Sequence, residues 1–524
     1  MLKSSTRSTF FKRSLIMGWA LLCVLSLNIR AQNTMTIEAD HPQNKISRHI
    51  YGQFSEHLGT GIYGGLWVGE DSDIPNTKGF RNDVVKALQE LEIPNLRWPG
   101  GCFADEYHWR DGIGPRDERP TTVNTHWGMV EESNAVGTHE FMRLTELLDT
   151  EPYISANVGS GTPREMANWI EYMTYGGNST LANLRRKNGR EKPWKVKFWG
   201  IGNESWGCGG NMQPDYYADL YRRYATFAKE YSGNDLYKIA SGFSDDNYGW
   251  TETVMREASN HMDAISLHYY TIPTGNWGNK GPSKNFGEKM YFAGLSQGLK
   301  IDKLIHGHIN RMEKYDPDND VALAVDEWGI WTNPLPGTNP GFLQQQNSIR
   351  DALIASTTLD IFNKHSDRIR IANIAQTVNV LQAMVLTNGN KMLKTPTYYV
   401  FDFYKVHHDK MLLPLHLGTT NYTYKGASIP GLSATASKDS SGTINLTVTN
   451  LHAHKAQKVE VDVRGQNVDD VTQARILTAN EVDAINTFEN PDNVSPQSYT
   501  DYTLKEDQLT LQIPSKSVIV LRIE

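Results

Sequence analysis

Two patterns of apolar residues divide the chain. Between residues 50 and 376, short apolar runs alternate with longer segments whose apolar residues recur at helical spacing. Alternating strands and helices are typical of a parallel sheet covered by helices. The predicted strands are residues 50–55, 95–98, 153–158, 196–201, 238–243, 264–268, 321–325 and 369–375. The predicted helices include residues 81–91, 139–149, 163–172, 215–231 and 344–364. Eight such units predict a (β/α)8 barrel.

The pattern changes after about residue 396. Residues 446–449, 458–463, 509–513 and 518–523 mostly alternate between apolar and polar side chains, with Gly, Asn and Asp turns between them. This period of two is typical of an antiparallel β-sandwich. Residues 34–39 alternate similarly. We therefore expect an N-terminal strand in 32–48 that joins the sandwich, a barrel over 49–395 and the sandwich over 396–524.

The first residues resemble a targeting segment. Lys3, Arg7, Lys12 and Arg13 precede an apolar run over 15–27, and Ala31 offers a cleavage site. Such a run is short for a membrane span. We expect residues 1–31 to be a signal peptide and the protein to be exported, either periplasmic or extracellular. A single membrane anchor is the alternative, and no other segment approaches the length of a transmembrane helix.

Charge narrows the partners. The chain of 524 residues carries a net charge of -7, and loss of the basic N-terminal segment would make it more acidic. Acidic proteins are poor ligands for nucleic acids and for anionic membrane surfaces. Neutral polymers such as polysaccharides stay compatible with this composition.

Two glutamates end predicted strands. Glu204 follows the strand at 196–201, and Glu327 follows the strand at 321–325. The carboxyl ends of barrel strands form the catalytic face of such folds. Cleavage of a glycosidic bond needs one carboxyl group that carries a proton and a second that is ionised. The pair predicts a glycosidase, whereas the simpler interpretation is two surface acids.

Five short motifs at the strand ends strengthen this interpretation. They are GQFSEH at 52–57, RWPGG at 97–101, GNE at 202–204, DEW at 326–328 and ANIAQ at 372–376. Together, and in this order, they resemble the α-L-arabinofuranosidases of glycoside hydrolase family 51. The resemblance covers nearly the whole chain after residue 31, although sister families of the same barrel share the plan of two glutamates.

The resemblance implies a retaining double displacement. Glu204 would be the general acid/base and Glu327 the nucleophile, with their carboxyl groups about 5 to 5.5 Å apart. Repulsion from an ionised Glu327 would keep Glu204 protonated until Glu327 becomes a glycosyl ester.

The same resemblance implies supporting roles. Arg97 and Tyr270 would donate hydrogen bonds to Glu327, and His268 would orient Glu204 or line the pocket. Asn203 would donate to the sugar 2-hydroxyl group. A capping Asn and a structural His are the simpler alternatives.

The remaining predicted site residues face the sugar. Glu56 and Gln376 are implied ligands of substrate hydroxyl groups, and Trp127 and Trp331 implied apolar walls or a lid. Trp127 lies in a long loop, where local packing is the alternative role.

Two cysteines remain outside the predicted signal peptide. Cys102 and Cys208 each follow a predicted strand at the same end of the barrel. In an oxidising compartment two such thiols can pair. A disulfide and two free buried thiols are both open at this point. Cys102 stands where other family members carry Asn, so an amide contact to sugar is absent here.

The main hypothesis is an exo-acting α-L-arabinofuranosidase that acts on arabinan, arabinoxylan or their oligosaccharides. It implies no metal and no organic cofactor, and relatives commonly form homo-oligomers such as hexamers. An endoglucanase or xylosidase on the same scaffold is the first alternative, and a silent carbohydrate-binding protein is the second. A metallohydrolase using His57 and His268 is disfavoured, because the sequence has no HExxH or HxxH spacing.

Overall fold

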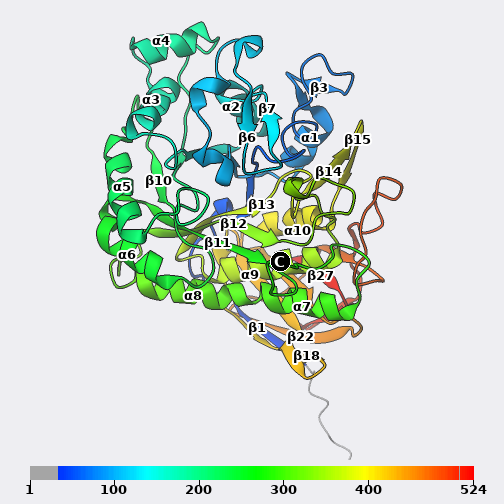
Figure 1. Cartoon of the computed structure of the whole chain (residues 1–524). Helices are drawn as coiled ribbons and strands as arrows, with labels where there is room; N and C mark the ends of the chain where they lie inside the picture. The colour runs from blue at the N-terminus through cyan, green and yellow to red at the C-terminus, as the bar shows by residue number, and fades with distance from the viewer. Residues whose placement is uncertain (1–32, 507) are drawn as a thin grey trace, which may run out of the picture.

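The computed structural model describes residues 33–506 and 508–524 (Figure 1). The predicted signal peptide lies outside the described residues. Eight parallel strands close into a barrel in which β13 pairs with β2. In chain order they are β2 (Gly52–Phe54), β5 (Asn95–Trp98), β8 (Glu151–Ala156), β9 (Phe198–Ile201), β10 (Tyr237–Ala240), β11 (Ala264–Thr271), β12 (Ala322–Ile330) and β13 (Ile369–Ala375). Each overlaps a predicted strand, so the predicted barrel is confirmed.

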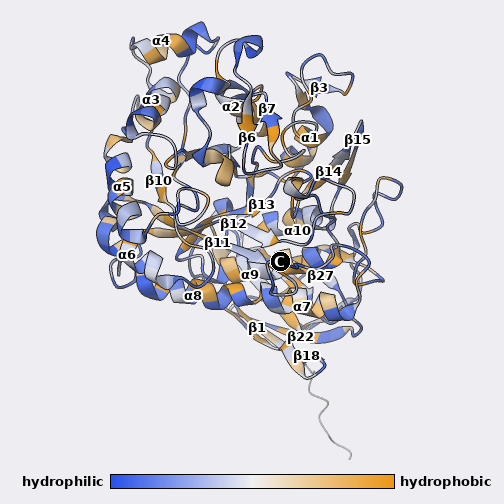
Figure 2. Cartoon of the chain, in the orientation of Figure 1, coloured by the Kyte–Doolittle hydropathy of each residue, from blue (hydrophilic) through white to orange (hydrophobic). Residues whose placement is uncertain are grey.

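Helices follow the strands and cover the barrel. They are α1 (Asn82–Glu90), α2 (Thr138–Leu148), α3 (Pro163–Thr174), α4 (Thr180–Lys187), α5 (Pro214–Phe227), α6 (Tyr248–Ala258), α7 (Glu288–Gly298), α8 (Lys300–Met312), α9 (Ile349–Lys364) and α10 (Pro396–Tyr404). Along α5 and α8, hydrophilic and hydrophobic residues alternate (Figure 2), because one face of each helix packs inward.

One helix lies between the two domains. α9 begins at Ile349 rather than at the predicted residue 344, since Ser348 and Asp351 form a capping box there. Most of its residues are buried. It packs against β12 of the barrel and also against β20 (Leu432–Lys438) and β21 (Ile444–Asn450) of the C-terminal domain. The contact joins the barrel wall to the sandwich.

Two sheets form that C-terminal domain, and the sandwich prediction is confirmed. One sheet has the order β17-β1-β22-β26-β25 and the other β16-β20-β21-β27-β23-β24. Strand β1 (Asn33–Glu38) pairs parallel with β22 (Gln457–Arg464), and Figure 1 shows the two side by side. The other strands are β16 (Met411–Leu412), β17 (Leu415–Gly418), β23 (Val471–Thr478), β24 (Gln497–Ser498), β25 (Tyr502–Lys505), β26 (Gln508–Ile513) and β27 (Ser517–Ile523).

The N-terminal strand belongs to this sandwich because of its side chains. Met35 and Ile37 are buried in the same apolar cluster as Val459 and Val461 of β22. Their alternation with Thr34 and Thr36 is the period-two pattern of the sequence.

Four separate two-stranded hairpins lie outside the barrel and the two large sheets in the described residues. They are β3 (Asn76–Thr77) with β4 (Phe80–Arg81), β6 (Thr122–Asn124) with β7 (Val130–Glu132), β14 (Val385–Asn388) with β15 (Lys391–Lys394), and β18 (Asn421–Tyr424) with β19 (Ala427–Pro430). Over residues 33–506 and 508–524, no helix has both the length and the apolar character of a membrane span.

Candidate active site

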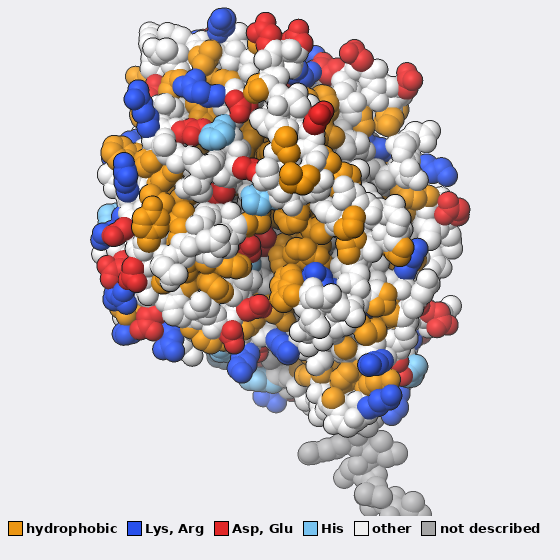
Figure 3. Space-filling model, in the orientation of Figure 1, with side chains coloured by type: hydrophobic (Ala, Val, Ile, Leu, Met, Phe, Trp, Pro, Cys, Tyr) orange, Lys and Arg blue, Asp and Glu red, His pale blue; other side chains and the backbone are white. Residues whose placement is uncertain are grey.

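The carboxyl ends of the barrel strands surround a cavity of about 260 Å³. On the face drawn in Figure 3, hydrophobic side chains line a hollow near the centre, with acidic side chains at its edge. Four predicted polar residues line the cavity together with Tyr270: Glu56, Glu204, Glu327 and Gln376. Its other walls include Leu58, Gly101, Cys102, Trp127, Trp206, Ser244, Trp277, Trp331, Leu343 and Leu381.

Glu327 is held by two donors. Arg97 Nη1 lies 2.8 Å from Glu327 Oε1, and the Tyr270 hydroxyl donates to Oε2 at 2.9 Å. Burial, followed by the charge of Glu327, raises the pKa of Tyr270 well above its ordinary value, so the phenol keeps its proton. Burial alone would lower the pKa of Arg97, but Asp326 and Glu327 raise it. The carboxylate therefore meets a permanent cation on one side and a phenol on the other.

Glu204 occupies a different setting. Its φ of 39° lies in the left-handed region, which is strained for a residue with a side chain. Its Oε1 lies 2.9 Å from His268 Nδ1. One carboxylate oxygen of Glu204, one of Glu327 and a ring nitrogen of His268 all lie within 4.8 Å of one another. Two carboxyl groups thus face the same small volume.

His268 connects both glutamates to Asp326. Its Nε2 lies 3.1 Å from Asp326 Oδ1, and its Nδ1 lies 3.6 Å from Glu327 Oε2. Burial would lower the pKa of His268, but the charge of Glu327 and hydrogen bonds to Asp326 and Glu204 raise it to about 10. The ring is therefore an imidazolium at neutral pH and donates to Glu204 and to Asp326.

Asp326 is a site residue to which the sequence assigned no role, although it belongs to the DEW motif. Side chains alternate along a regular strand, so Asp326 should face away from the side of Glu327. The pairing of β12 with β13 instead shifts register between Val325 and Trp328. This irregularity lets both acids contact Arg97, with Asp326 Oδ2 3.6 Å from Arg97 Nε. Tyr153 also donates to Asp326.

Glu56 is the acceptor of a separate group of donors. Its Oε1 accepts from Phe103 N at 3.0 Å and Trp127 Nε1 at 2.9 Å, and its Oε2 accepts from Gln376 Nε2 at 3.2 Å. Burial, followed by the charge of Glu327, raises the pKa of Glu56 to about 7. Three residues predicted to surround the sugar, Glu56, Trp127 and Gln376, therefore contact one another directly.

Two predicted residues stand behind the cavity wall. Asn203 is buried, its Oδ1 accepts from Arg97 Nη2 at 2.6 Å, and its Nδ2 lies 3.9 Å from Cys208 Sγ. Arg97 is likewise buried and faces Glu327 and Asp326. The structure places both side chains beside Glu204 and Glu327, but not among the residues that line the cavity.

Aromatic rings form the mouth. The Trp331 ring packs edge-on against Tyr270 and against Trp277, with ring centroids 5.0 and 5.4 Å apart. Trp206 donates to Gly242 O at 3.1 Å and packs on Phe243. Trp206 and Trp277 line the cavity but were not predicted from the sequence. Trp206 is two residues after Glu204, a spacing that could have drawn attention to it.

A buried aspartate ties the strand-end loops together. Asp105 accepts from the backbone N–H groups of Val158 and Gly159, both at 2.8 Å, and from Asn203 N at 3.2 Å. Burial raises the pKa of Asp105 to about 7. These three bonds fix the loop that presents Asn203 and Glu204.

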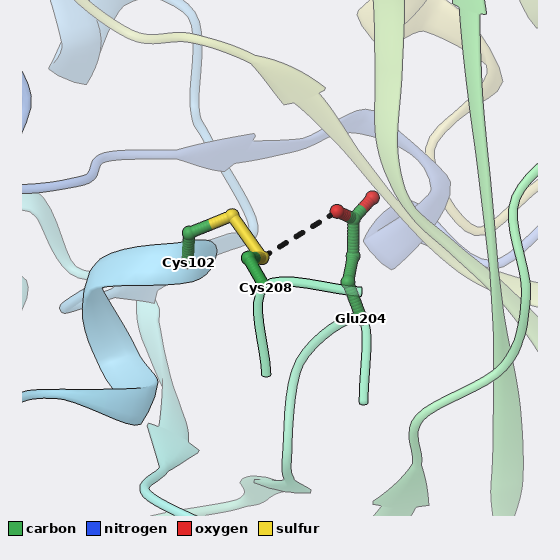
Figure 4. Close-up of side chains that lie close together, drawn as sticks. All are labelled: Cys102, Glu204 and Cys208. Carbon is green, nitrogen blue, oxygen red and sulfur yellow. Dashed lines mark hydrogen bonds between the residues drawn. A yellow bond between two sulfur atoms is a disulfide. The ribbon is translucent and has the colours of Figure 1, made fainter. Parts of the chain in front are cut away.

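Cys102 and Cys208 form a disulfide with Cα atoms 5.5 Å apart. It joins the turn after β5 to the turn after β9, beside Glu204 (Figure 4). The alternative of two free thiols does not describe this structure.

Comparisons with known proteins find relatives that match most of the chain. A family model described as the α-L-arabinofuranosidase C-terminal domain matches residues 326–517, and one described as the α-L-arabinofuranosidase 1 domain matches 87–284. An intracellular exo-α-L-arabinofuranosidase of Bacteroides ovatus is 49% identical over 98% of this chain and all of that protein.

Solved structures give the same result. The GH51 arabinofuranosidase of Xanthomonas axonopodis pv. citri has a TM-score of 0.93 and 52% identity, over 94% of this chain and all of that one. The α-L-arabinofuranosidase of Thermotoga maritima, solved with arabinose, has a TM-score of 0.80 and 32% identity over the same shares.

One expectation needs correction. The sequence predicted export to the periplasm or the cell exterior, and the Bacteroides ovatus relative, which matches nearly the whole chain, is an intracellular enzyme. The prediction of localisation is therefore wrong. It rested on basic and apolar residues before residue 32, which lie outside the described residues, whereas the similarity to that relative covers 98% of the chain.

Proposed function

The chain belongs to the α-L-arabinofuranosidases of glycoside hydrolase family 51, and from this premise we propose the finer chemistry. The enzyme removes terminal α-L-arabinofuranosyl groups from arabinan, arabinoxylan or their oligosaccharides, and the anomeric configuration is retained. The observation that carries the proposal is the approach of the Glu204 and Glu327 carboxylate oxygens to within 4.8 Å. Retaining enzymes hold these groups about 5 to 5.5 Å apart, whereas inverting enzymes need about 6.5 to 9.5 Å.

The first step forms a glycosyl ester. Glu327 attacks C1 of the arabinofuranosyl group while Glu204 gives its proton to the leaving oxygen. Arg97 and Tyr270 keep Glu327 in position by their hydrogen bonds. In the second step Glu204 takes a proton from water, the water oxygen attacks C1, and Glu327 leaves as a carboxylate.

The other cavity residues orient the sugar. Glu56 and Gln376 bind hydroxyl groups of the furanose, and Asn203, which is buried behind the cavity wall, positions Arg97 by accepting from its Nη2. Trp127 and Trp331 cover the ring. A small cavity with aromatic walls supports exo action on a chain end, since an endo-acting enzyme needs an open groove. This also weighs against the endoglucanase alternative.

The test compares three aryl glycosides: α-L-arabinofuranoside, β-D-xyloside and β-D-glucoside. We expect wild type to cleave the arabinofuranoside best and to release α-arabinose first, as followed by NMR. Glu204→Ala with azide should give the azide of retained configuration. Glu327→Ala should give no hydrolysis, and with azide only the inverted azide. Glu131→Ala, at an exposed glutamate on β7, is the matched control.

Two results would contradict the proposal. Release of β-arabinose first by wild type would exclude retention. Cleavage of the xyloside in preference to the arabinofuranoside would exclude the proposed substrate.

The resemblance also implies a homo-oligomer, with a hexamer as one candidate. Sedimentation of the full chain tests this.

A further inference from the structure

The proposed acid/base stands against a disulfide. Cys208 Sγ lies 3.6 Å from Glu204 Oε2, and Figure 4 shows the carboxylate directed at the sulfur. A sulfur in a disulfide carries no hydrogen, so this contact is not a hydrogen bond while the bridge is closed. Cys102 and Cys208 are only half-buried, and Cys102 lines the cavity. A reductant small enough to enter the cavity can therefore reach the bond.

We propose that reduction of the Cys102–Cys208 disulfide creates a site for a thiophilic divalent cation such as Zn²⁺. The ligands are the two thiolates and the Glu204 carboxylate, and the bound cation inhibits the enzyme. The inference rests on the proposed acid/base role of Glu204. A carboxylate that binds a cation can neither donate a proton to the leaving oxygen nor accept one from water.

The chemistry balances with a phosphine as reductant. The phosphorus supplies two electrons to the S–S bond and takes the oxygen of one water molecule, and the two protons of that water complete the two thiols. Zinc then replaces both thiol protons, which pass to the buffer. In reducing compartments, small thiols open protein disulfides instead, and they are oxidised to disulfides as they do so.

The distances fit a tetrahedral zinc site. With Zn–S bonds of about 2.3 Å and a Zn–O bond of about 2.1 Å, a sulfur and an oxygen ligand lie about 3.6 Å apart, and two sulfurs about 3.8 Å. The sulfur–oxygen distance already measures 3.6 Å. One oxygen of Glu204 and both sulfurs lie within 4.8 Å of one another. Only the sulfurs need to move, and reduction itself separates them to non-bonded contact.

The backbone keeps these ligands close after reduction. Gly207 N and Gly209 N, on either side of Cys208, both donate to Glu204 O, at 2.7 and 3.1 Å. Phe103 N, beside Cys102, donates to Glu56 Oε1. The two turns are therefore anchored independently of the bridge. The fourth zinc ligand would be water, because two of the three protein ligands, Cys102 and Glu204, line the cavity.

The decisive experiment compares oxidised and phosphine-reduced wild type, desalted without air. Hydrolysis of an aryl α-L-arabinofuranoside is measured as Zn²⁺ is added. We expect zinc to lower the rate of the reduced enzyme by about tenfold or more, with recovery in EDTA, and to leave the oxidised enzyme unchanged. The Cys102→Ala/Cys208→Ala variant, scaled to its own zinc-free rate, should show no such inhibition by zinc, with or without phosphine treatment.

A second readout does not depend on activity. Co²⁺ added to reduced wild type should give the near-ultraviolet charge-transfer absorption of cobalt–thiolate bonds, and oxidised wild type should not. Equal zinc inhibition of both forms would place the cation at Glu204, His268 and Glu327 and would overturn the proposal. Absence of the cobalt band would also overturn it. If oxidised wild type has no arabinofuranosidase activity in the absence of zinc, the proposed function is refuted instead. The cobalt spectrum would still decide the metal site.

Discussion

The two glutamates at the barrel mouth occupy unlike surroundings. Glu327 meets a guanidinium and a phenol, and its side chain is 7% exposed. Glu204 is 18% exposed, and it meets one imidazolium and a disulfide sulfur that has no hydrogen to donate. A nucleophile must stay fixed opposite C1, whereas an acid/base must exchange protons with a leaving group and then with water. The barrel therefore holds Glu327 in place with two hydrogen-bond donors and leaves part of the Glu204 carboxyl group accessible to solvent.

Removal of the guanidinium fork should have the largest effect. Arg97→Lys keeps a positive charge, but an ammonium cannot replace the bonds from Nη1 to Glu327 and from Nη2 to Asn203 together. Hydrogen bonds that involve a charged group are worth about 1.5 to 3 kcal/mol each, so losing them should lower kcat about a hundredfold or more. Steady-state kinetics on an aryl arabinofuranoside measure this. Arg110→Lys, at an exposed arginine over Trp109, is the control. A change in KM alone, with kcat unchanged, would show that Arg97 does not hold Glu327 in position for the reaction.

The pH dependence of stability tests whether His268, which contacts Glu204, is protonated in the folded protein. The pKa of His268 is about 10 in the folded protein, against an ordinary value of 6.5. Between these values the folded protein holds a proton that the unfolded chain has released. This contribution to stability is fully present below pH 6.5 and is lost as the pH rises through 10. Each unit of pKa shift corresponds to about 1.4 kcal/mol, so the contribution amounts to several kcal/mol.

His268→Gln removes this titration. We expect the variant to have a lower melting temperature than wild type at pH 6.5, and the difference to shrink as the pH approaches 10. Calorimetry at several pH values measures it, with His416→Gln at an exposed site as the control. A constant difference between wild type and variant over this range would show that His268 is neutral in the folded protein.

Loss of the phenol should matter less than loss of the cation. Tyr270→Phe removes one neutral donor to Glu327 and keeps the ring. A single such hydrogen bond contributes about 0.5 to 1.5 kcal/mol, and up to about 3 kcal/mol when its acceptor is charged, so kcat should fall about tenfold. Tyr269→Phe is the matched control, because the hydroxyl of Tyr269 donates to Gln297 O instead. Equal losses in the two variants would contradict a special role for the bond to Glu327.

The sequence predicted the barrel well because its signals are local. Each barrel strand is an apolar run between turns, and the ends of these runs carry the polar residues that meet in the cavity. Alternation over residues 34–39 indicated a strand with one buried face, and in the structure this strand pairs with β22. By contrast, the place of Asp326 depends on a register shift between neighbouring strands, which no single segment encodes. Trp277 reaches the cavity from a loop whose course has no periodic signal.

The smallest change should come from a contact that touches neither Glu204 nor Glu327. Trp127→Phe keeps an aromatic wall and removes the Nε1 donor to Glu56. Loss of that bond should raise KM about three- to fivefold, which corresponds to about 1 kcal/mol, and should leave kcat nearly unchanged. Kinetics on an aryl arabinofuranoside measure both constants, and Trp67→Phe, whose Nε1 has no hydrogen-bond partner among the described residues, is the control. A fall in kcat as large as that of Tyr270→Phe would show that Glu56 and the wall around Glu327 act as one unit, because the charge of Glu327 is already felt at Glu56. In that case Glu56 would belong with Glu327 as a carboxyl group that must be held in position, in contrast to the more exposed Glu204.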